Sequence, residues 1–183
     1  MTHSLNNKQS NDEQLVRAKE AWHILNEFTI SLTTATGIIR RAIAEEEKSL
    51  VKLPHPDIPV FQFTKMIAFN YIVMCLYKWS EFWKSYKDVI PSELKEPFKN
   101  VVKEIDNKGV IQYRNQYVGH IHDKYGHLMT EENQNKAILR IVGSDAERFL
   151  YWINSGKKLR NDHSLVYLAQ NTRDFISKQC DLP

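Results

Sequence analysis

The sequence contains little glycine and little proline. It has six of each among 183 residues, together about 7%, whereas average usage is roughly 12%. No G-x-G-x-x-G or G-x-x-x-x-G-K-[ST] segment is present, so the common glycine-rich phosphate loops are excluded. The same scarcity argues against a turn-rich β-barrel and against a low-complexity linker.

Cysteine and net charge are also low. Two cysteines, Cys75 and Cys180, make no disulfide framework, and Cys75 lies in an apolar run that predicts a buried side chain. A formal net charge of +3 excludes a uniformly basic nucleic-acid-binding surface. The N-terminal segment lacks the apolar run of a signal peptide, and the apolar run 66–77 is too short to span a bilayer. We therefore expect a cytoplasmic protein that does not associate with membranes.

The apolar residues recur at helical spacing. From Leu15 to Leu32 they follow the i, i+3, i+4 pattern, and Ser10 and Glu13 fit a capping box before them. We predict a disordered tail over 1–10, a first helix to about Thr33, and a kink within 33–37, where threonines and a glycine cluster.

Proline and glycine divide the rest of the chain into further helices. Three prolines in 53–59 predict a loop, after which Thr64 would cap a buried central helix over 65–88. Helices are predicted over 91–109, 110–124, 130–142, 144–156 and from Asn161 or Asp162 to Cys180. Four of these helix ends fall at Gly109, Gly126, Gly143 and Gly156. With no alternating strand pattern, we predict an all-α, single-domain bundle of six to eight helices over 11–183.

Titratable and phosphate-binding side chains gather in one short segment. His120, His122 and His127 fall within eight residues, directly after Arg114 and Asn115. Histidine can act as acid or base near neutral pH, arginine binds phosphate oxygens bidentately, and asparagine can orient either group. Cleavage of an RNA phosphodiester needs these functions and can proceed with them without a metal ion.

The spacing of Arg114 and His120 constrains how they could meet. Six helical steps leave them roughly 120° apart around a regular helix. Three arrangements would bring them together: a helix distortion near Gly119, an arginine side chain that reaches around the helix, or a cleft shared with a second copy. Tyr113 and Tyr117 do share a stripe with His120, and such a stripe could stack on bases.

The segment RNQYVGHIHDK resembles the R-N-x-x-x-A-H segments of HEPN proteins from phage abortive-infection systems and toxin–antitoxin pairs. Arg114, Asn115 and His120 match the arginine, polar and histidine positions of that motif, and Gly119 stands where a small residue is expected. The resemblance implies an all-α, metal-independent ribonuclease without a cofactor, whose active site forms between two protomers.

We therefore expect Arg114, Asn115 and His120 to be catalytic, in a homodimer that cleaves RNA and can bind an antitoxin protein. Tyr113, Tyr117, His122 and Lys124 are the candidates for substrate contacts, although His122 lies outside the motif and suits a solvated surface equally. One alternative is a non-catalytic HEPN-like module that binds nucleotide, RNA or a protein partner. Another is an interaction protein in which the motif is only a structural polar network.

Two other interpretations of the segment are weaker. Arg17 and His23 have the same spacing as Arg114 and His120, but Ala18 follows Arg17 where the motif needs a polar residue. His120 and His122, with His127 nearby, could bind a transition metal. Alternate residues on a helix point apart, however, and no H-E-x-x-H or C-x-x-C accompanies them, so we expect no metal site.

Overall fold

The computed structural model describes residues 2–50, 58–118, 130–156, 163–180 and 182. Within these ranges every regular element is helical, which confirms the predicted all-α bundle. The elements are α1 (Thr2–Leu50), α2 (Ile58–Tyr86), α3 (Ser92–Asn107), α4 (Val110–Tyr113), the π-helical turn η1 (Arg114–Val118), α5 (Glu131–Val142), α6 (Ala146–Ile153) and α7 (Leu165–Cys180).

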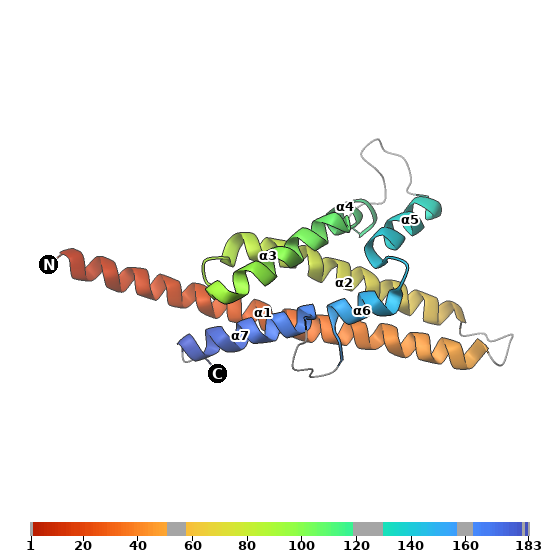
Figure 1. The fold of residues 1–183 in the computed structure, drawn as a ribbon, viewed down its shortest axis with the longest axis horizontal. Helices are drawn as coiled ribbons and strands as arrows, with labels where there is room; N and C mark the ends of the chain where they lie inside the picture. The colour runs from red at the N-terminus through yellow and green to blue at the C-terminus, as the bar shows by residue number, and fades with distance from the viewer. Residues whose placement is uncertain (1, 51–57, 119–129, 157–162, 181, 183) are drawn as a thin grey trace.

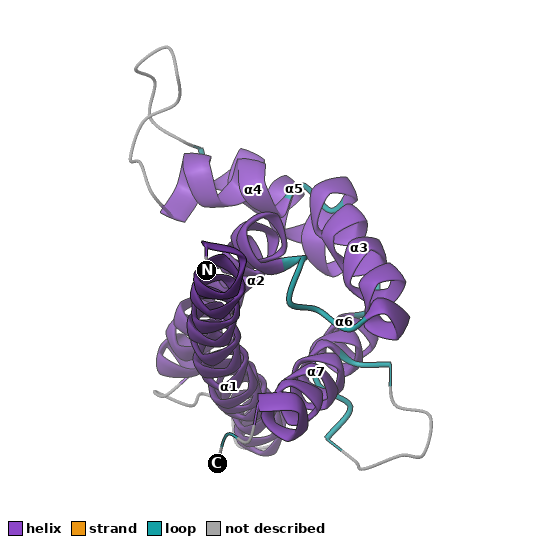
Figure 2. Ribbon diagram, turned by 90° about the vertical axis from the view of Figure 1, so that its left-hand side faces the viewer, coloured by secondary structure: helices purple, strands orange, loops and turns teal. Residues whose placement is uncertain are grey.

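Two long helices form the base of the bundle. α1 and α2 lie side by side and antiparallel over most of α2, while α7 runs along α1 and α3 packs on α2 (Figures 1 and 2). α4 and η1 also pack on α2, so the segment that carries Arg114 rests directly on the central helix.

An aromatic stack joins three of these helices. The Trp79 ring of α2 is fully buried and lies between Phe28 of α1, at a centroid distance of 5.3 Å, and Phe98 of α3, at 4.9 Å. Aromatic rings dominate core energetics because each buries a large apolar area. The apolar run around Cys75 is thus the centre of the core, as predicted, and Cys75 itself is buried.

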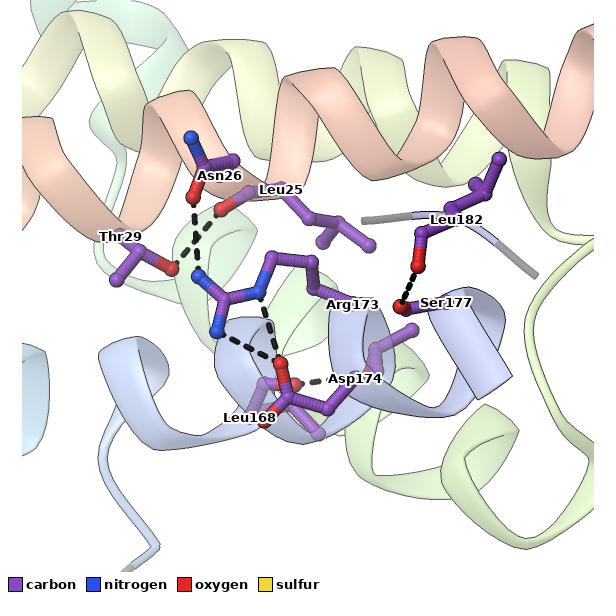
Figure 3. Close-up of polar contacts among 9 residues, drawn as sticks. Leu25, Asn26, Thr29, Leu168, Arg173, Asp174, Ser177 and Leu182 are labelled. Atoms are coloured by element: carbon purple, nitrogen blue, oxygen red, sulfur yellow. Dashed lines mark hydrogen bonds and ion pairs between the residues drawn. The ribbon is translucent and has the colours of Figure 1, made fainter. Parts of the chain in front are cut away.

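A polar contact holds α7 against α1 (Figure 3). Arg173 of α7 donates to the Asn26 side-chain oxygen at 2.9 Å and forms an ion pair with Asp174 at 2.6 Å. The guanidinium is therefore satisfied by a neutral and an acidic partner at this helix contact.

α1 is longer than predicted and continues through 33–37 without interruption. It begins at Thr2, so Ser10 lies inside the helix and the predicted N-cap there was wrong. The expected break at 33–37 was also wrong. Thr36 donates to the Leu32 carbonyl at 2.8 Å and accepts from Asn154 at 3.2 Å, while buried Ala35 packs in the core, so tertiary contacts outweigh the weak helix propensity. The domain boundary at residue 11 stays a prediction.

α2 also starts earlier than predicted. It begins at Ile58, so Thr64 is not a cap; its hydroxyl instead donates to the Val60 carbonyl one turn back at 2.8 Å. Pro59 fits the first turn because the backbone N–H groups there have no partner within the helix, so the N–H that proline lacks is not needed. With its 29 residues α2 is long and apolar enough to cross a membrane by length and composition, a test that a buried core helix also passes.

The other described helix ends follow local signals. Pro91 precedes α3, and Gly109 and Gly143 follow α3 and α5 with positive φ, all at predicted helix ends. Thr130 and Asp145 cap α5 and α6, close to the starts predicted at 130 and 144. α6 ends at Ile153, three residues before Gly156. At the start of α7 the Ser164 hydroxyl accepts from the Tyr167 N–H at 3.4 Å, whereas the predicted caps at 161 and 162, like the predicted helix end at Gly126, lie outside the described residues.

Candidate functional site

The segment that carries Arg114 begins at a left-handed glycine. Gly109 adopts φ +70° between α3 and α4, and a Cβ atom there would lie 3.0 Å from the Arg140 guanidinium carbon. Arg140 donates to the Asn107 carbonyl at 3.2 Å, so α5 is fastened to this turn. The close turn returns the chain onto α2 and sets the position of Arg114 five residues later.

Tyr113 anchors that segment to α2. Its side chain is only 1% exposed, its ring packs edge-to-face on Phe69 at 5.6 Å, and its hydroxyl donates to Asn70 at 3.1 Å. Gln134 of α5 lies at the other side of the hydroxyl, at 3.5 Å. Burial raises the pKa of Tyr113. The prediction that Tyr113 contacts substrate was wrong, because both the ring and the hydroxyl are used within the core.

Arg114 lies over an aromatic ring of the central helix. Its guanidinium carbon is 4.6 Å from the centroid of the Tyr77 ring, within the range of a cation–π contact. One terminal nitrogen donates to the Asn115 side-chain oxygen at 3.0 Å. The Nε atom is buried and has no hydrogen-bond partner among the described atoms. The sequence pair Arg114–Asn115 is therefore also a pair in space, with Arg114 half-buried and Asn115 exposed.

A π-helical turn starts at Arg114. Residues 114–118 depart from α geometry immediately after α4, which is the kind of distortion expected from the spacing, but several residues before Gly119. π-helical turns are rare and frequent at functional sites, because the wider turn changes the direction of the side chains that follow it. Whether Arg114 meets His120 is not settled by this turn, since His120 lies outside the described residues.

Tyr117 is half-buried one turn beyond Tyr113. The two rings stack at a centroid distance of 5.0 Å with an interplanar angle of 28°. Partial burial raises the pKa of Tyr117. Because Tyr113 covers one face of the ring, Tyr117 keeps at most one face for a ligand and stays a predicted substrate contact. His122 and Lys124 lie outside the described residues, and their roles also stay predictions.

The second Arg–His pair of the sequence has a different environment. Arg17 forms a 2.7 Å ion pair with Asp88 and donates to the Ser85 carbonyl at 2.6 Å. The hydrogen bond from Arg17 lowers the pKa of the Asp88 carboxyl. Arg17 thus joins α1 to the end of α2 and is neutralised there. No carboxylate in the described part of the chain forms such an ion pair with Arg114.

Tyr77, Asn70 and Gln134 belong to the site but were not predicted. Tyr77 lies on α2, 37 positions before Arg114 in the sequence. A hydrogen bond with Glu81 raises the pKa of Tyr77, and the positive charge of Arg114 acts to lower that pKa. Neither periodicity nor spacing could pair residues of two different helices.

Other chemistries find less support in the described residues. No group of three histidine, cysteine or acidic side chains lies there in an arrangement that could hold a metal ion. Burial raises the pKa of the Cys75 thiol to about 11, which keeps it protonated and unreactive near neutral pH. Around Arg114 the described residues instead hold a cation over an aromatic ring with an amide partner, and no described carboxylate forms an ion pair with it.

Comparisons with known proteins support the fold alone. No family model and no curated protein matches the chain. The chain is similar to a solved structure from the mobile metagenome of V. paracholerae, the integron cassette protein Vpc_cass2. The two share 24% identity with a TM-score of 0.73, over 87% of this chain and 95% of that one. The likeness shows a common all-α fold.

Proposed function

We propose that the chain is a metal-independent endoribonuclease of a defence or toxin–antitoxin system. Arg114 would bind the scissile phosphate, Asn115 would orient it, and His120 would act as general acid or base at a cleft between two copies. The observation that carries the proposal is the environment of Arg114: held over Tyr77, hydrogen-bonded to Asn115, and paired with no described carboxylate.

The geometry suits phosphate better than a structural role. Arg17 and Arg173, which lie at contacts between helices, each donate through Nε to a carboxylate, Asp88 and Asp174 respectively. Arg114 has a neutral amide partner and, among the described atoms, no acceptor at its buried Nε, so the donors of its guanidinium are not committed to a described carboxylate and an incoming phosphate would supply one. Stacking on Tyr77 fixes the guanidinium plane before the ligand arrives, which lowers the entropy lost on binding.

The chemistry assigned to the histidine balances without a metal. The ribose 2′-oxygen would attack phosphorus and lose its proton to a base, while the bond to the 5′-oxygen breaks and that oxygen takes a proton from an acid. His120 is the candidate for one of these transfers, and Arg114 would stabilise the charge that develops on the phosphoryl oxygens.

The test is RNA cleavage in the presence of a chelator. We expect Arg114→Ala and His120→Ala to lower the cleavage rate by on the order of 10²-fold or more, as removal of a charge-stabilising donor or an acid–base group does elsewhere. Arg114→Lys should also be slower, because an ammonium cannot make the bidentate contact.

His23→Ala is the matched control. His23 follows Arg17 at the same spacing and is exposed on α1, so its loss should leave cleavage unchanged. If the parent cleaves no RNA, or if both site variants cleave at the parental rate, the proposal is wrong. Arg114-dependent RNA binding without turnover would instead identify a non-catalytic binding module.

A further inference from the structure

One outer face of the α1–α2 pair exposes large apolar side chains at helical spacing. Its members are 41–59% exposed: Ile30 and Ile38 on α1, and Val60, Phe63, Ile67 and Tyr71 on α2. The α2 residues recur at i, i+3, i+7 and i+11, and thus form one stripe. We call these six residues the α1–α2 apolar face. Figure 2 shows α3, α6 and α7 on the other side of the pair.

The α1–α2 apolar face contains a groove. A groove of about 500 Å³ runs between the two helices, with small side chains such as Thr34, Ala35 and Ala68 along it. Tyr71 is fixed across the groove, because its hydroxyl lies 2.9 Å from that of Ser31 in a hydrogen bond. Phe63 is 58% exposed and is absent from the groove lining, so it stands beside the groove as a projecting ring.

The face carries no charge of its own. Residues 28–39 of α1 and 66–77 of α2 contain no acidic or basic residue. Two lysines near its ends are paired within the chain, Lys65 with Glu46 and Lys78 with Glu27, and Arg41, one turn beyond Ile38, is exposed at the rim. In a two-fold contact the same surface meets itself, so any unpaired charge near the axis would face its own copy. A face without charge over these stretches avoids that repulsion.

The area also fits a protein interface. Side chains of this size offer on the order of 150–250 Å² each when fully exposed. Six of them, each about half exposed, present on the order of 600 Å² of apolar surface, at the upper limit of the patches that monomers expose. A standard interface buries about 800 Å² on each partner, which the six residues and a polar rim would supply.

We infer that the α1–α2 apolar face is the contact with a second copy of this chain, with Phe63 of each copy packed in the groove of the other. A lipid surface fits less well, because membrane-binding faces are rich in free lysine and arginine, whereas Lys65 and Lys78, two of the cations that flank this face, are paired with Glu46 and Glu27. The inference names the surface of the dimer in the proposed function, and its test is independent of RNA.

The experiment measures the molar mass of the full chain by light scattering and by sedimentation over a range of concentrations. We expect twice the 21.5 kDa chain mass for the parent. Phe63→Glu and Thr34→Arg should each weaken the dimer at least ~30-fold, as loss of a central contact residue does. Thr34 is an exposed groove residue, so the arginine variant should fold even if the Phe63 variant does not.

Leu139→Glu is the matched control, because Leu139 is 63% exposed on α5, outside the face, and its change should leave the dimer intact. A parent with the mass of one chain at every concentration overturns the inference, and so does a dimer that both face variants leave unchanged. A monomer that floats with phosphatidylcholine–phosphatidylglycerol vesicles would show that lipid covers the face instead. A monomer that cleaves RNA refutes this inference and the shared cleft but keeps the ribonuclease activity, whereas a face-dependent dimer that cleaves none refutes the activity alone.

Discussion

At the scale of single residues, the partners of an arginine separate a structural role from a ligand-binding role. Arg17 joins α1 to α2 through the Asp88 carboxylate, and Arg173 joins α7 to α1 through Asn26 while it pairs with Asp174 of its own helix. Arg114 reaches a ring and an amide, so its positive charge is positioned by the fold but not neutralised by any described side chain. Positioning without neutralisation is what an anion site requires.

The neighbouring Tyr113 should act on stability and not on catalysis. We expect Tyr113→Phe to lower the free energy of unfolding by about 1 kcal/mol, because the hydrogen bond to Asn70 is lost while the ring still packs. Tyr113→Ala should cost about 3–5 kcal/mol, since it also empties a fully buried site. Denaturant unfolding followed by circular dichroism measures both changes.

Tyr117→Phe is the control at the half-buried ring that stacks on Tyr113. It should change stability less than Tyr113→Phe does. If Tyr113→Phe left the free energy of unfolding unchanged and yet slowed RNA cleavage, Tyr113 would be a substrate contact after all.

At the scale of elements, two glycines should respond to alanine in opposite ways. Gly37 lies inside α1, where a Cβ atom would meet nothing within 4 Å, so Gly37→Ala should stabilise the protein by about 0.5–1 kcal/mol. Gly109 has φ +70° and faces the Arg140 guanidinium at 3.0 Å, so Gly109→Ala should destabilise it by about 1–2 kcal/mol. Thermal unfolding of both variants measures the pair.

Gly143→Ala separates the two causes at Gly109. Gly143 has φ +80° with nothing within 4 Å of a Cβ atom, so only backbone strain remains there. Its cost should therefore be smaller than that of Gly109→Ala. Equal melting temperatures for all three variants would contradict the assignment of these turns.

The elements that were predicted correctly are those with local causes. Gly109, Gly143, Pro91 and Thr130 mark their helix ends through backbone geometry or a side-chain cap, and both are written in a few adjacent residues. The segment 33–37 has weak propensity but stays helical, because Asn154 and the core hold it from elsewhere in the fold. Such tertiary contacts cannot be predicted from the residues that are adjacent in the sequence.

In the candidate site, too, contacts between adjacent residues could be predicted, whereas contacts between helices could not. Arg114 and Asn115 are adjacent in the chain, so their pairing could be anticipated, and a helix distortion was one of the three arrangements that the spacing to His120 allowed. Tyr77 could not be anticipated, because only the packing of η1 on α2 brings it under Arg114. The role of Tyr113 was predicted wrongly because its spacing of four residues from Tyr117 fits a buried stripe of a helix and a binding stripe equally.

At the scale of the whole molecule, α2 connects the core, the candidate site and the exposed face. Its buried side carries Trp79, one flank carries Tyr77 beneath Arg114, and its outer stripe carries Phe63 and Ile67. Phe28 of α1 and Phe98 of α3 both stack on the Trp79 ring of α2. The three helices therefore share one contact and should unfold together.

Trp79 is therefore the residue whose loss should weaken the entire bundle. We expect Trp79→Ala to lower the free energy of unfolding by about 3–5 kcal/mol in one cooperative transition, because it removes the ring shared by three helices and leaves a cavity. Trp79→Phe should cost less, since a ring remains and the indole N–H that it deletes has no hydrogen-bond partner among the described atoms. Tyr151→Ala, at a 48% exposed site on α6, should change stability little. Denaturant unfolding read by circular dichroism and by tryptophan fluorescence tests this, and two separate transitions in the Trp79→Ala protein would mean that the helices do not depend on a shared core.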